Sequence, residues 1–236
     1  MSERARVDEL SGWYLKDQLD FDRRMIDYRY RSIKPHLRGP HGLELGPAEG
    51  VMTRMLIDDF SSLTVVDGAG DLLARIPNLP NLAKVHALFE EFEPGGRFNT
   101  IVMDHILEHV AEPIALLNRA RDWLAPAGCV VVGVPNGSSF HRLAGVKMGL
   151  LREPCELNDR DRALGHRRVY TRESLFRDLQ AAGLEPNAWG GVFFKPVSNQ
   201  QIQDTWTQTM MDGFYELGKD FPAHANELYA ICERPS

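Results

Sequence analysis

The stretch Leu43-Glu44-Leu45-Gly46-Pro47-Ala48-Glu49-Gly50 decides how the rest of this chain is interpreted. Its pattern predicts a short buried strand that ends in a carboxylate and a turn bracketed by glycines. The following Val51-Met52-Thr53-Arg54-Met55-Leu56 has the apolar spacing of a helix. Such a strand, turn and helix favour a nucleotide-like ligand, because glycine lets the backbone approach closely and a helix N-terminus offers unpaired N–H groups.

The spacing inside this turn separates the possible ligand classes. A phosphate-binding P-loop ends in Gly-Lys-Ser/Thr, which this turn lacks, and a dinucleotide fingerprint has Gly at its first, third and sixth positions. The chain has Gly46, Ala48 and Val51 there. Both patterns therefore fit poorly. What remains is an acid, one spacer, Gly, three spacers and Gly, in which the Glu44 carboxylate can accept hydrogen bonds from an ammonium group.

A second acid ends the next predicted strand. Residues 63–67 are rich in β-branched side chains and end in Asp67, 21 residues after Gly46. An acid at the tip of the second strand of a nucleotide-binding unit accepts hydrogen bonds from both ribose hydroxyls. Gly68 then turns the chain, and Asp71 is predicted to cap a short helix.

The composition disfavours several classes of function. The chain of 236 residues is long enough for a single domain over residues 1–236, and its formal net charge of −6 argues against sequence-independent nucleic-acid binding. Cys129, Cys155 and Cys232 form no CxxC pair, so neither a disulfide framework nor a zinc site is expected. The N-terminus lacks the apolar core of a signal peptide, and no stretch is long enough to span a bilayer. We therefore expect a cytoplasmic protein without membrane or nucleic-acid partners.

Three stretches together carry a family resemblance. The turn from Glu44 to Gly50 resembles the first motif of the class I S-adenosylmethionine (SAM)-dependent methyltransferases, Glu/Asp-x-Gly-x-Gly-x-Gly, with Ala48 in place of the middle glycine. Residues 100–103 are predicted as a buried fourth strand, and the Leu-Glu-His-Val run at 107–110 is similar to one in small-molecule methyltransferases of the ubiquinone-pathway type. Residues 124–128, Leu-Ala-Pro-Ala-Gly, resemble the family's turn into a fifth strand.

The resemblance implies an α/β, Rossmann-like fold with a seven-stranded, mostly parallel sheet and an antiparallel final strand. It implies an N-terminal helical cap over residues 1–38 and a lid insertion after strand five over residues 137–170. It also implies SAM as the cofactor, and Leu88 stands where the family often has an Asp for the adenine. The implied cofactor-binding residues are Glu44, Gly46, Pro47, Ala48, Gly50, Asp67, Gly68, Leu88, Phe89 and Asp104.

The candidate catalytic residues are histidines. A helix is predicted to begin near Asp104 and to stop before Pro113, which would place His105 and His109 on one helix face. Methyl transfer to an alcohol or ammonium requires removal of a proton, and the ordinary pKa of histidine suits it to accept one at neutral pH. His105 is the favoured base, with His109 and His166 as rivals.

Two segments are predicted to cover the substrate. The insertion at 137–170 is cationic within an acidic chain, so it is a candidate lid over an anionic substrate, although its charges could instead balance its own acids. Aromatic rings before the first strand could attract a sulfonium by cation–π interaction or could simply pack helices against the sheet. The predicted substrate-binding residues are Tyr14, Tyr28, Tyr30, His141, Arg142, Arg167 and Arg168.

The last third of the chain is predicted to complete the domain. Thr171 and Gly183 have the positions of an N-cap and a C-terminal stop for a helix between them, and strands are predicted near 184–189 and 227–232. A single polar helix over 198–220 carries an apolar stripe that favours core packing or a homodimer contact. The stripe consists of Trp206, Met210, Met211, Phe214 and Tyr215.

We therefore expect a SAM-dependent methyltransferase that modifies an O or N nucleophile of a small, anionic metabolite, in secondary metabolism. Two alternatives stay open. An NAD-linked Rossmann oxidoreductase is disfavoured by the missing glycines. A non-catalytic SAM-binding protein is disfavoured by the polar residues that follow the fourth strand.

Overall fold

A seven-stranded sheet in the order β3-β2-β1-β4-β5-β7-β6 runs through the computed structural model, which describes residues 3–7 and 20–235. Strands β1 to β5 pair in parallel, and β7 is antiparallel to its neighbours β5 and β6. The predicted sheet with an antiparallel final strand is therefore confirmed. The strands are β1 (His41–Leu45), β2 (Ser62–Asp67), β3 (Leu82–His86), β4 (Phe98–Asp104), β5 (Leu124–Pro135), β6 (Glu185–Val192) and β7 (Glu227–Glu233).

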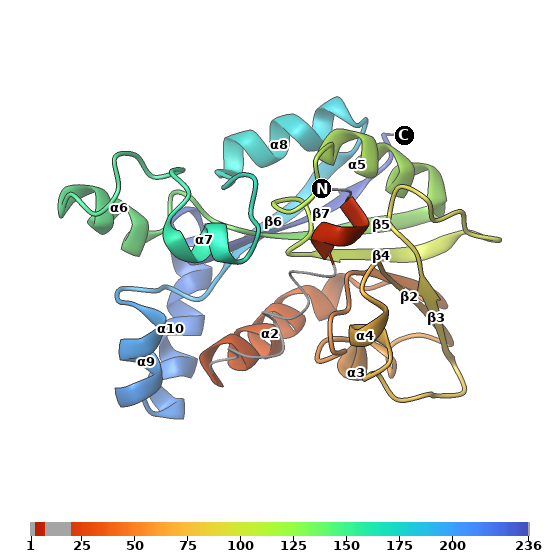
Figure 1. Ribbon diagram of the computed structural model, residues 1–236, viewed down its shortest axis with the longest axis horizontal. Helices are drawn as coiled ribbons and strands as arrows, with labels where there is room; N and C mark the ends of the chain where they lie inside the picture. Colours follow the sequence, from red (N-terminus) through yellow and green to blue (C-terminus); the bar gives the residue numbers. More distant parts are fainter. Residues whose placement is uncertain (1–2, 8–19, 236) are drawn as a thin grey trace.

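Helices cover both faces of this sheet (Figure 1). On one face lie α5 (Pro113–Trp123) and α8 (Arg172–Ala181), and on the other α2 (Asp20–Ile33), α3 (Thr53–Leu56) and α4 (Gly70–Leu73). Successive strand residues point to opposite faces, so Val130 and Val132 belong to one buried cluster and Val131 to the other. The near-continuous apolar runs of the central strands follow from this two-sided burial.

The ends of the helices test the predicted caps. The Thr171 side chain accepts a hydrogen bond from the Ser174 backbone N–H at the start of α8, and Gly183 after its end has φ +67°, as predicted. Asp71 is not a cap, because α4 begins at Gly70 with Ala69 as its N-cap. Asp71 instead lies in the first turn of the helix.

The helix predicted between Asp104 and Pro113 is wrong. The residues there form turns, and His105 has the left-handed φ of +57°. The His105 N–H donates to the Gly133 carbonyl, which extends the pairing of β4 with β5 by one residue. The carbonyls of residues 107, 110 and 111 accept hydrogen bonds from the Arg168 guanidinium. The left-handed backbone at His105 breaks a right-handed helix near its start, and Arg168 takes the Leu107 carbonyl, which a helix would pair internally.

The remaining helices extend the molecule beyond the sheet. The insertion contains α6 (Phe140–Lys147) and α7 (Asp159–Ala163), and the predicted helix over 198–220 is in fact two, α9 (Asn199–Thr205) and α10 (Gln208–Asp220). Trp206 is extended between them. Short 3₁₀ turns are η1 (Lys34–His36) and η2 (Pro222–His224), and residues 3–7 are helical. None of the described helices is long and apolar enough to cross a membrane.

The apolar stripe of α10 is mostly core. Met211 and Tyr215 are buried with Phe21, Tyr28 and Phe193 in a third cluster between α2, α10 and the end of β6. Trp206 and Phe214 pack against this cluster, whereas Met210 is exposed. The packing interpretation of the stripe is therefore confirmed for four of its members.

Candidate functional site

A cavity of about 410 Å³ lies at the carboxyl ends of the parallel strands. Residues from α2, from the insertion and from the loop after β6 line it together with the turn after β1. This is the edge where open α/β sheets bind ligands. All but one of the predicted cofactor-binding residues line the cavity, and the exception is Gly50. Those that line it are Glu44, Gly46, Pro47, Ala48, Asp67, Gly68, Leu88, Phe89 and Asp104.

The turn after β1 has left-handed backbone at three alternate residues. The φ angles of Gly46, Ala48 and Gly50 are +69°, +47° and +79°. A Cβ on Gly46 would lie 2.3 Å from Ile106 Cδ1, and the positive φ at this position also favours glycine. Ala48 keeps the conformation of the glycine that it replaces, at a cost of about 1–2 kcal/mol for a residue with a Cβ.

The two predicted acids face the cavity from neighbouring strands. Glu44 is buried and accepts a hydrogen bond from Thr53 Oγ1 at 2.6 Å. Burial raises the pKa of Glu44 to about 8, and the Thr53 hydroxyl opposes this shift only in part. Asp67 accepts a hydrogen bond from the Ala69 N–H at 2.8 Å, and burial raises its pKa as well. Both carboxyls are therefore partly desolvated before any ligand arrives.

Four ionisable side chains meet beside this end of the cavity, and we call them the charged cluster: Arg29, Asp104, His105 and Glu227. Arg29 Nε lies 2.7 Å from an Asp104 oxygen, and Arg29 Nη1 lies 3.1 Å from Glu227 Oε1. His105 Nε2 is 3.5 Å from the same Glu227 oxygen. The cluster therefore links α2 to the ends of β4 and β7.

The environment of His105 changes the role expected for it. Burial and Arg29 lower the pKa of His105, but the carboxylates of Glu227 and Glu108 outweigh them and raise it to about 10. Glu108, whose oxygen is 3.1 Å from His105 Nδ1, is fully buried and keeps its charge beside the ring. At neutral pH His105 is thus a cation that pairs with the carboxylates of Glu108 and Glu227. This raised pKa argues against His105 as a free base at neutral pH, and its catalytic role stays a prediction.

The two rival histidines lie against each other. The rings of His109 and His166 are 4.7 Å apart in an edge-to-face arrangement, and both line the cavity. Burial lowers the pKa of His109 to about 4, so this ring is neutral. Glu108, His109 and His166 place potential ligand atoms within 4.8 Å of one another and could hold a metal ion, which the sequence spacing did not indicate.

The tyrosines predicted to bind substrate are structural where the structure describes them. Tyr28 and Tyr30 are buried outside the cavity, and their hydroxyls donate to Asp212 at 2.8 Å and Asp59 at 2.6 Å. They fix α2 to its neighbours, so their predicted substrate role is wrong. Tyr14 lies outside the described residues.

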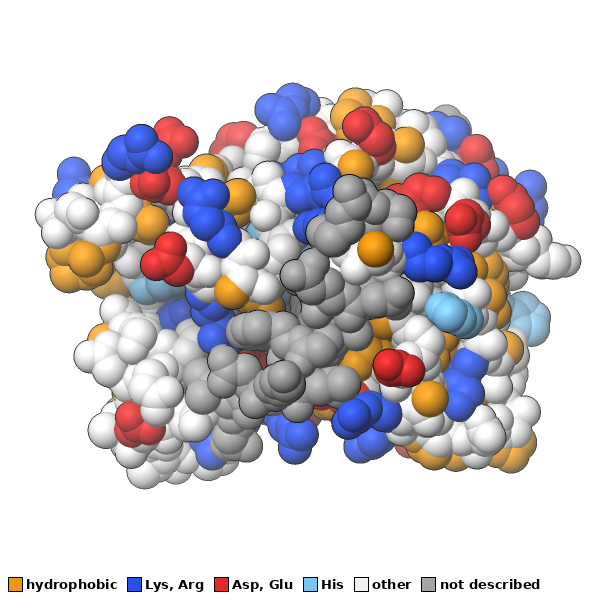
Figure 2. Space-filling view, in the orientation of Figure 1, with side chains coloured by type: hydrophobic (Ala, Val, Ile, Leu, Met, Phe, Trp, Pro, Cys, Tyr) orange, Lys and Arg blue, Asp and Glu red, His pale blue; other side chains and the backbone are white. Residues whose placement is uncertain are grey.

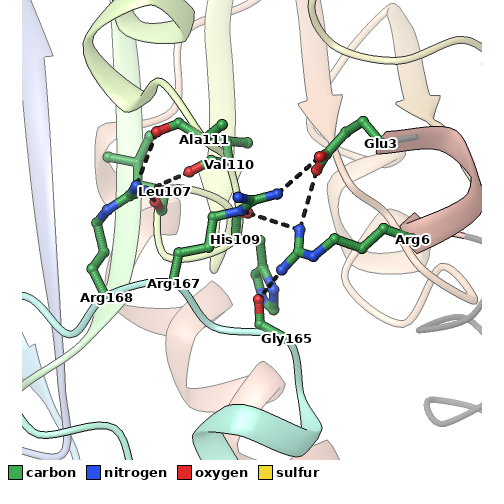
Figure 3. A network of polar contacts seen from close by, with 9 residues as sticks. All are labelled: Glu3, Arg6, Leu107, His109, Val110, Ala111, Gly165, Arg167 and Arg168. Atoms are coloured by element: carbon green, nitrogen blue, oxygen red, sulfur yellow. Dashed lines mark hydrogen bonds and ion pairs between the residues drawn. The ribbon is translucent and has the colours of Figure 1, made fainter. Parts of the chain in front are cut away.

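Two of the predicted arginines hold the protein together instead of facing a substrate (Figure 3). Arg167 Nε donates to the His109 carbonyl at 2.8 Å and its Nη2 pairs with Glu3, while Arg168 binds the carbonyls described above. Neither residue lines the cavity, so their predicted substrate role is wrong. Figure 2 shows cationic and anionic side chains interspersed over this face, without a continuous basic field.

His141 and Arg142 do line the cavity, but Arg142 is already occupied. Its guanidinium donates to the Pro154 carbonyl at 2.7 Å and pairs with Asp161 at 3.0 Å. Sequence reasoning did not select Glu227 or Lys195, which line the same space. Glu227 begins one expected strand and Lys195 follows another, yet no local pattern marks either residue as part of a site.

The fold and the acids at the ends of β1 and β2 define a SAM-dependent methyltransferase of class I. Residues 18–188 match the family model described as a methyltransferase domain. The chain belongs to this family.

Relatives and solved structures agree with this assignment. The chain is 27% identical over 202 residues to a ubiquinone biosynthesis O-methyltransferase of Dinoroseobacter shibae, covering 78% of this chain and 76% of that protein. A protein of the same description from Ruegeria pomeroyi is 29% identical over 111 residues, which cover 46% of this chain and 42% of the relative.

Two solved structures share the fold. N-methyltransferase NodS from Bradyrhizobium japonicum, in complex with S-adenosylhomocysteine (SAH), has a TM-score of 0.59 at 18% identity and covers 95% of this chain and 92% of its own. The CcbJ methyltransferase from Streptomyces caelestis has a TM-score of 0.63 at 15% identity and covers 98% of both chains. At these identities the likeness concerns the fold alone.

Proposed function

We propose that the protein transfers the methyl group of SAM to an O or N nucleophile of a small, anionic metabolite, in secondary metabolism. The observation that carries this proposal is one cavity that joins the Glu44–Asp67 edge to the charged cluster. Oxygen is the favoured nucleophile, because the relative with the long match is described as an O-methyltransferase.

The cofactor would lie along the carboxyl ends of β1 and β2. Glu44 would accept hydrogen bonds from its ammonium group and Asp67 from its ribose hydroxyls, with the adenine against Leu88 and Phe89. Asp104, at the end of β4, would then be the closest of these residues to the methyl group. The left-handed turn after β1 supports this placement, since it brings backbone close to the cavity.

We infer that Glu227 accepts the proton of the nucleophile. Its Oε2 is buried without a hydrogen-bond partner among the described residues, while Arg29 and His105 hold Oε1. The nucleophile attacks the methyl carbon in line with the C–S bond, whose electron pair passes to sulfur and leaves SAH. The proton of the nucleophile passes to Glu227, and His105 acts as a positioning cation.

Two measurements test the function. Calorimetric titration should show that SAH binds and NAD does not, and tighter binding of NAD would overturn the assignment. Incubation with SAM labelled in the methyl group should transfer label to hydroxyl- or amine-bearing acceptors in a fragment panel. Absence of transfer to every acceptor, with SAH still bound, would contradict the proposed reaction.

The role of Glu227 has its own test. Glu227→Gln should lower kcat by at least tenfold while the affinity for SAH stays unchanged, because the amide cannot take the proton. The matched control is Glu185→Gln, on an exposed carboxylate at the start of β6. An unaltered kcat in the Glu227 variant would remove this residue as the proton acceptor.

A further inference from the structure

The lining of the cavity includes a buried cation that has no ion-pair partner among the described residues. Lys195, in the loop after β6, is 8% exposed and lines the cavity. Among residues 3–7 and 20–235 it makes no ion pair or hydrogen bond, and its Nζ lies 5.7 Å from the centre of the Phe21 ring. Buried ammonium groups are almost always paired, so this one is arranged to meet a group that enters the cavity.

The other cations nearby are already paired. Arg142 is held by two backbone carbonyls and by Asp161, and Arg160 pairs with Asp22 at 2.9 Å. Asp22 and Glu227 lie near Lys195, but beyond ion-pair distance. An anion that enters the cavity would therefore pair with the ammonium group of Lys195 and not with the arginines of the insertion.

Two neutral polar side chains also line the cavity. His141 Nδ1 and Asn199 Oδ1 are buried without hydrogen-bond partners among the described residues. Burial, and then the charges of Lys195 and Arg142, lower the pKa of His141 to about 3, so its ring is neutral and can donate one hydrogen bond. The Lys195 ammonium supplies one positive charge and the His141 ring one neutral donor, which together suit a carboxylate with its single negative charge. A phosphate group, by contrast, is usually met by several charged donors or an arginine fork.

We propose that Lys195 is the anion-binding residue of the acceptor subsite and receives a carboxylate of the methyl acceptor. This inference rests on the proposed function and names the class of acceptor. The carboxylate would pair with the Lys195 ammonium, next to His141. The nucleophile at the other end of the acceptor would then face the charged cluster. Burial and Arg160 lower the pKa of Lys195 to about 8, so the group is mostly charged at neutral pH, and a bound carboxylate would strengthen that charge.

A binding experiment separates this inference from the proposed reaction. The protein saturated with SAH is titrated by calorimetry with 3,4-dihydroxybenzoate and, separately, with its methyl ester, which lacks the charge. We expect the acid to bind at least tenfold more tightly than the ester. Lys195→Met should weaken the acid at least tenfold, Lys195→Arg should retain most of its affinity, and the ester should not distinguish the variants.

The matched control is Lys147→Met, an exposed lysine in α6, which should bind both compounds like the unaltered protein. Equal affinity of the acid for the unaltered protein and the Lys195→Met variant would overturn the inference, as would equal binding of acid and ester or no binding of either. A loss of SAH affinity in Lys195→Met would assign the residue to the cofactor carboxylate and would also overturn it. None of these outcomes depends on turnover, so failure of the methyl-transfer test is a separate result.

Discussion

The carboxyl group of Glu44 is mostly protonated at neutral pH, since burial raises its pKa to about 8. A ligand ammonium that binds the carboxylate form must therefore displace a proton. Below this pKa the ionised fraction falls about tenfold per pH unit, so the affinity for SAH should rise about tenfold between pH 6 and 7 and level off above pH 8. Calorimetry across this range measures the slope.

The control for this prediction is Glu44→Gln. The amide cannot ionise, so the variant should bind SAH more weakly and with little dependence on pH over the same range. A slope of equal size in both proteins would show that another group is responsible.

Asp67 is the second residue whose effect on cofactor binding can be stated in advance. If its carboxylate accepts hydrogen bonds from both ribose hydroxyls, Asp67→Ala should lose roughly 1.5–3 kcal/mol of SAH binding. Asp71→Ala, four residues on and exposed in α4, is the control and should bind as before. Unchanged SAH affinity in the Asp67 variant would show that the ribose hydroxyls bind to other residues.

The sequence predicted those site residues that lie in one motif or at the ends of adjacent strands. Glu44 and Gly46 belong to one strand and turn, and Asp67 ends the adjacent strand, so spacing alone predicted that they meet. Glu227 reaches the cavity only because β7 inserts between β5 and β6, and Lys195 only because the segment that follows β6 packs against α2. Their contribution depends on tertiary packing that no short motif records.

At the level of elements, Gly133 in β5 allows Asp104 to take its position in the charged cluster. A Cβ on Gly133 would lie 2.2 Å from Asp104 Oδ1. Gly133→Ala should therefore displace Asp104 from Arg29, destabilise the fold by about 1–3 kcal/mol and reduce methyl transfer. Denaturant unfolding and the labelled-SAM assay measure the two effects.

The matched change is Gly213→Ala in the interior of α10. No atom lies within 4 Å of a Cβ built there, so alanine should stabilise the helix by up to about 1 kcal/mol and leave activity unchanged. Equal stability of the two variants would show that the contact at Gly133 is easily accommodated.

Elements were predicted well where hydrophobic period and length agree. The central strands are continuous apolar runs, and α8 has both its cap and its glycine stop. The segment after β4 has helical spacing, yet His105 has left-handed backbone and Arg168 takes the Leu107 carbonyl, which a helix would use. The break between α9 and α10 at Trp206 was not predicted either, because Thr207 caps a new helix inside a continuous polar pattern.

At the scale of the molecule, the insertion and α2 meet across the cavity. Arg160 of α7 pairs with Asp22 of α2, and residues 148–152 between α6 and α7 include exposed Met148 and Leu150. We expect the insertion to become more ordered when SAH and an acceptor bind, as a lid would. Trypsin should then cut after Lys147 or Arg152 more slowly with ligands than without them.

Cleavage after Lys219 in α10 provides the internal reference, because this helix lies outside the insertion. Equal rates at Arg152 with and without ligands would identify the insertion as a static surface.

The short helix over residues 3–7 has a practical consequence for handling the protein. Glu3 and Arg6 line the cavity, and Arg6 contacts the carbonyls of His109 and Gly165 (Figure 3). Arg234, near the other end of the chain, binds backbone carbonyls at the end of α5 instead. An affinity tag joined ahead of residue 1 should therefore hinder ligand entry until a protease removes it, whereas the same tag after residue 236 should leave SAH affinity unaltered.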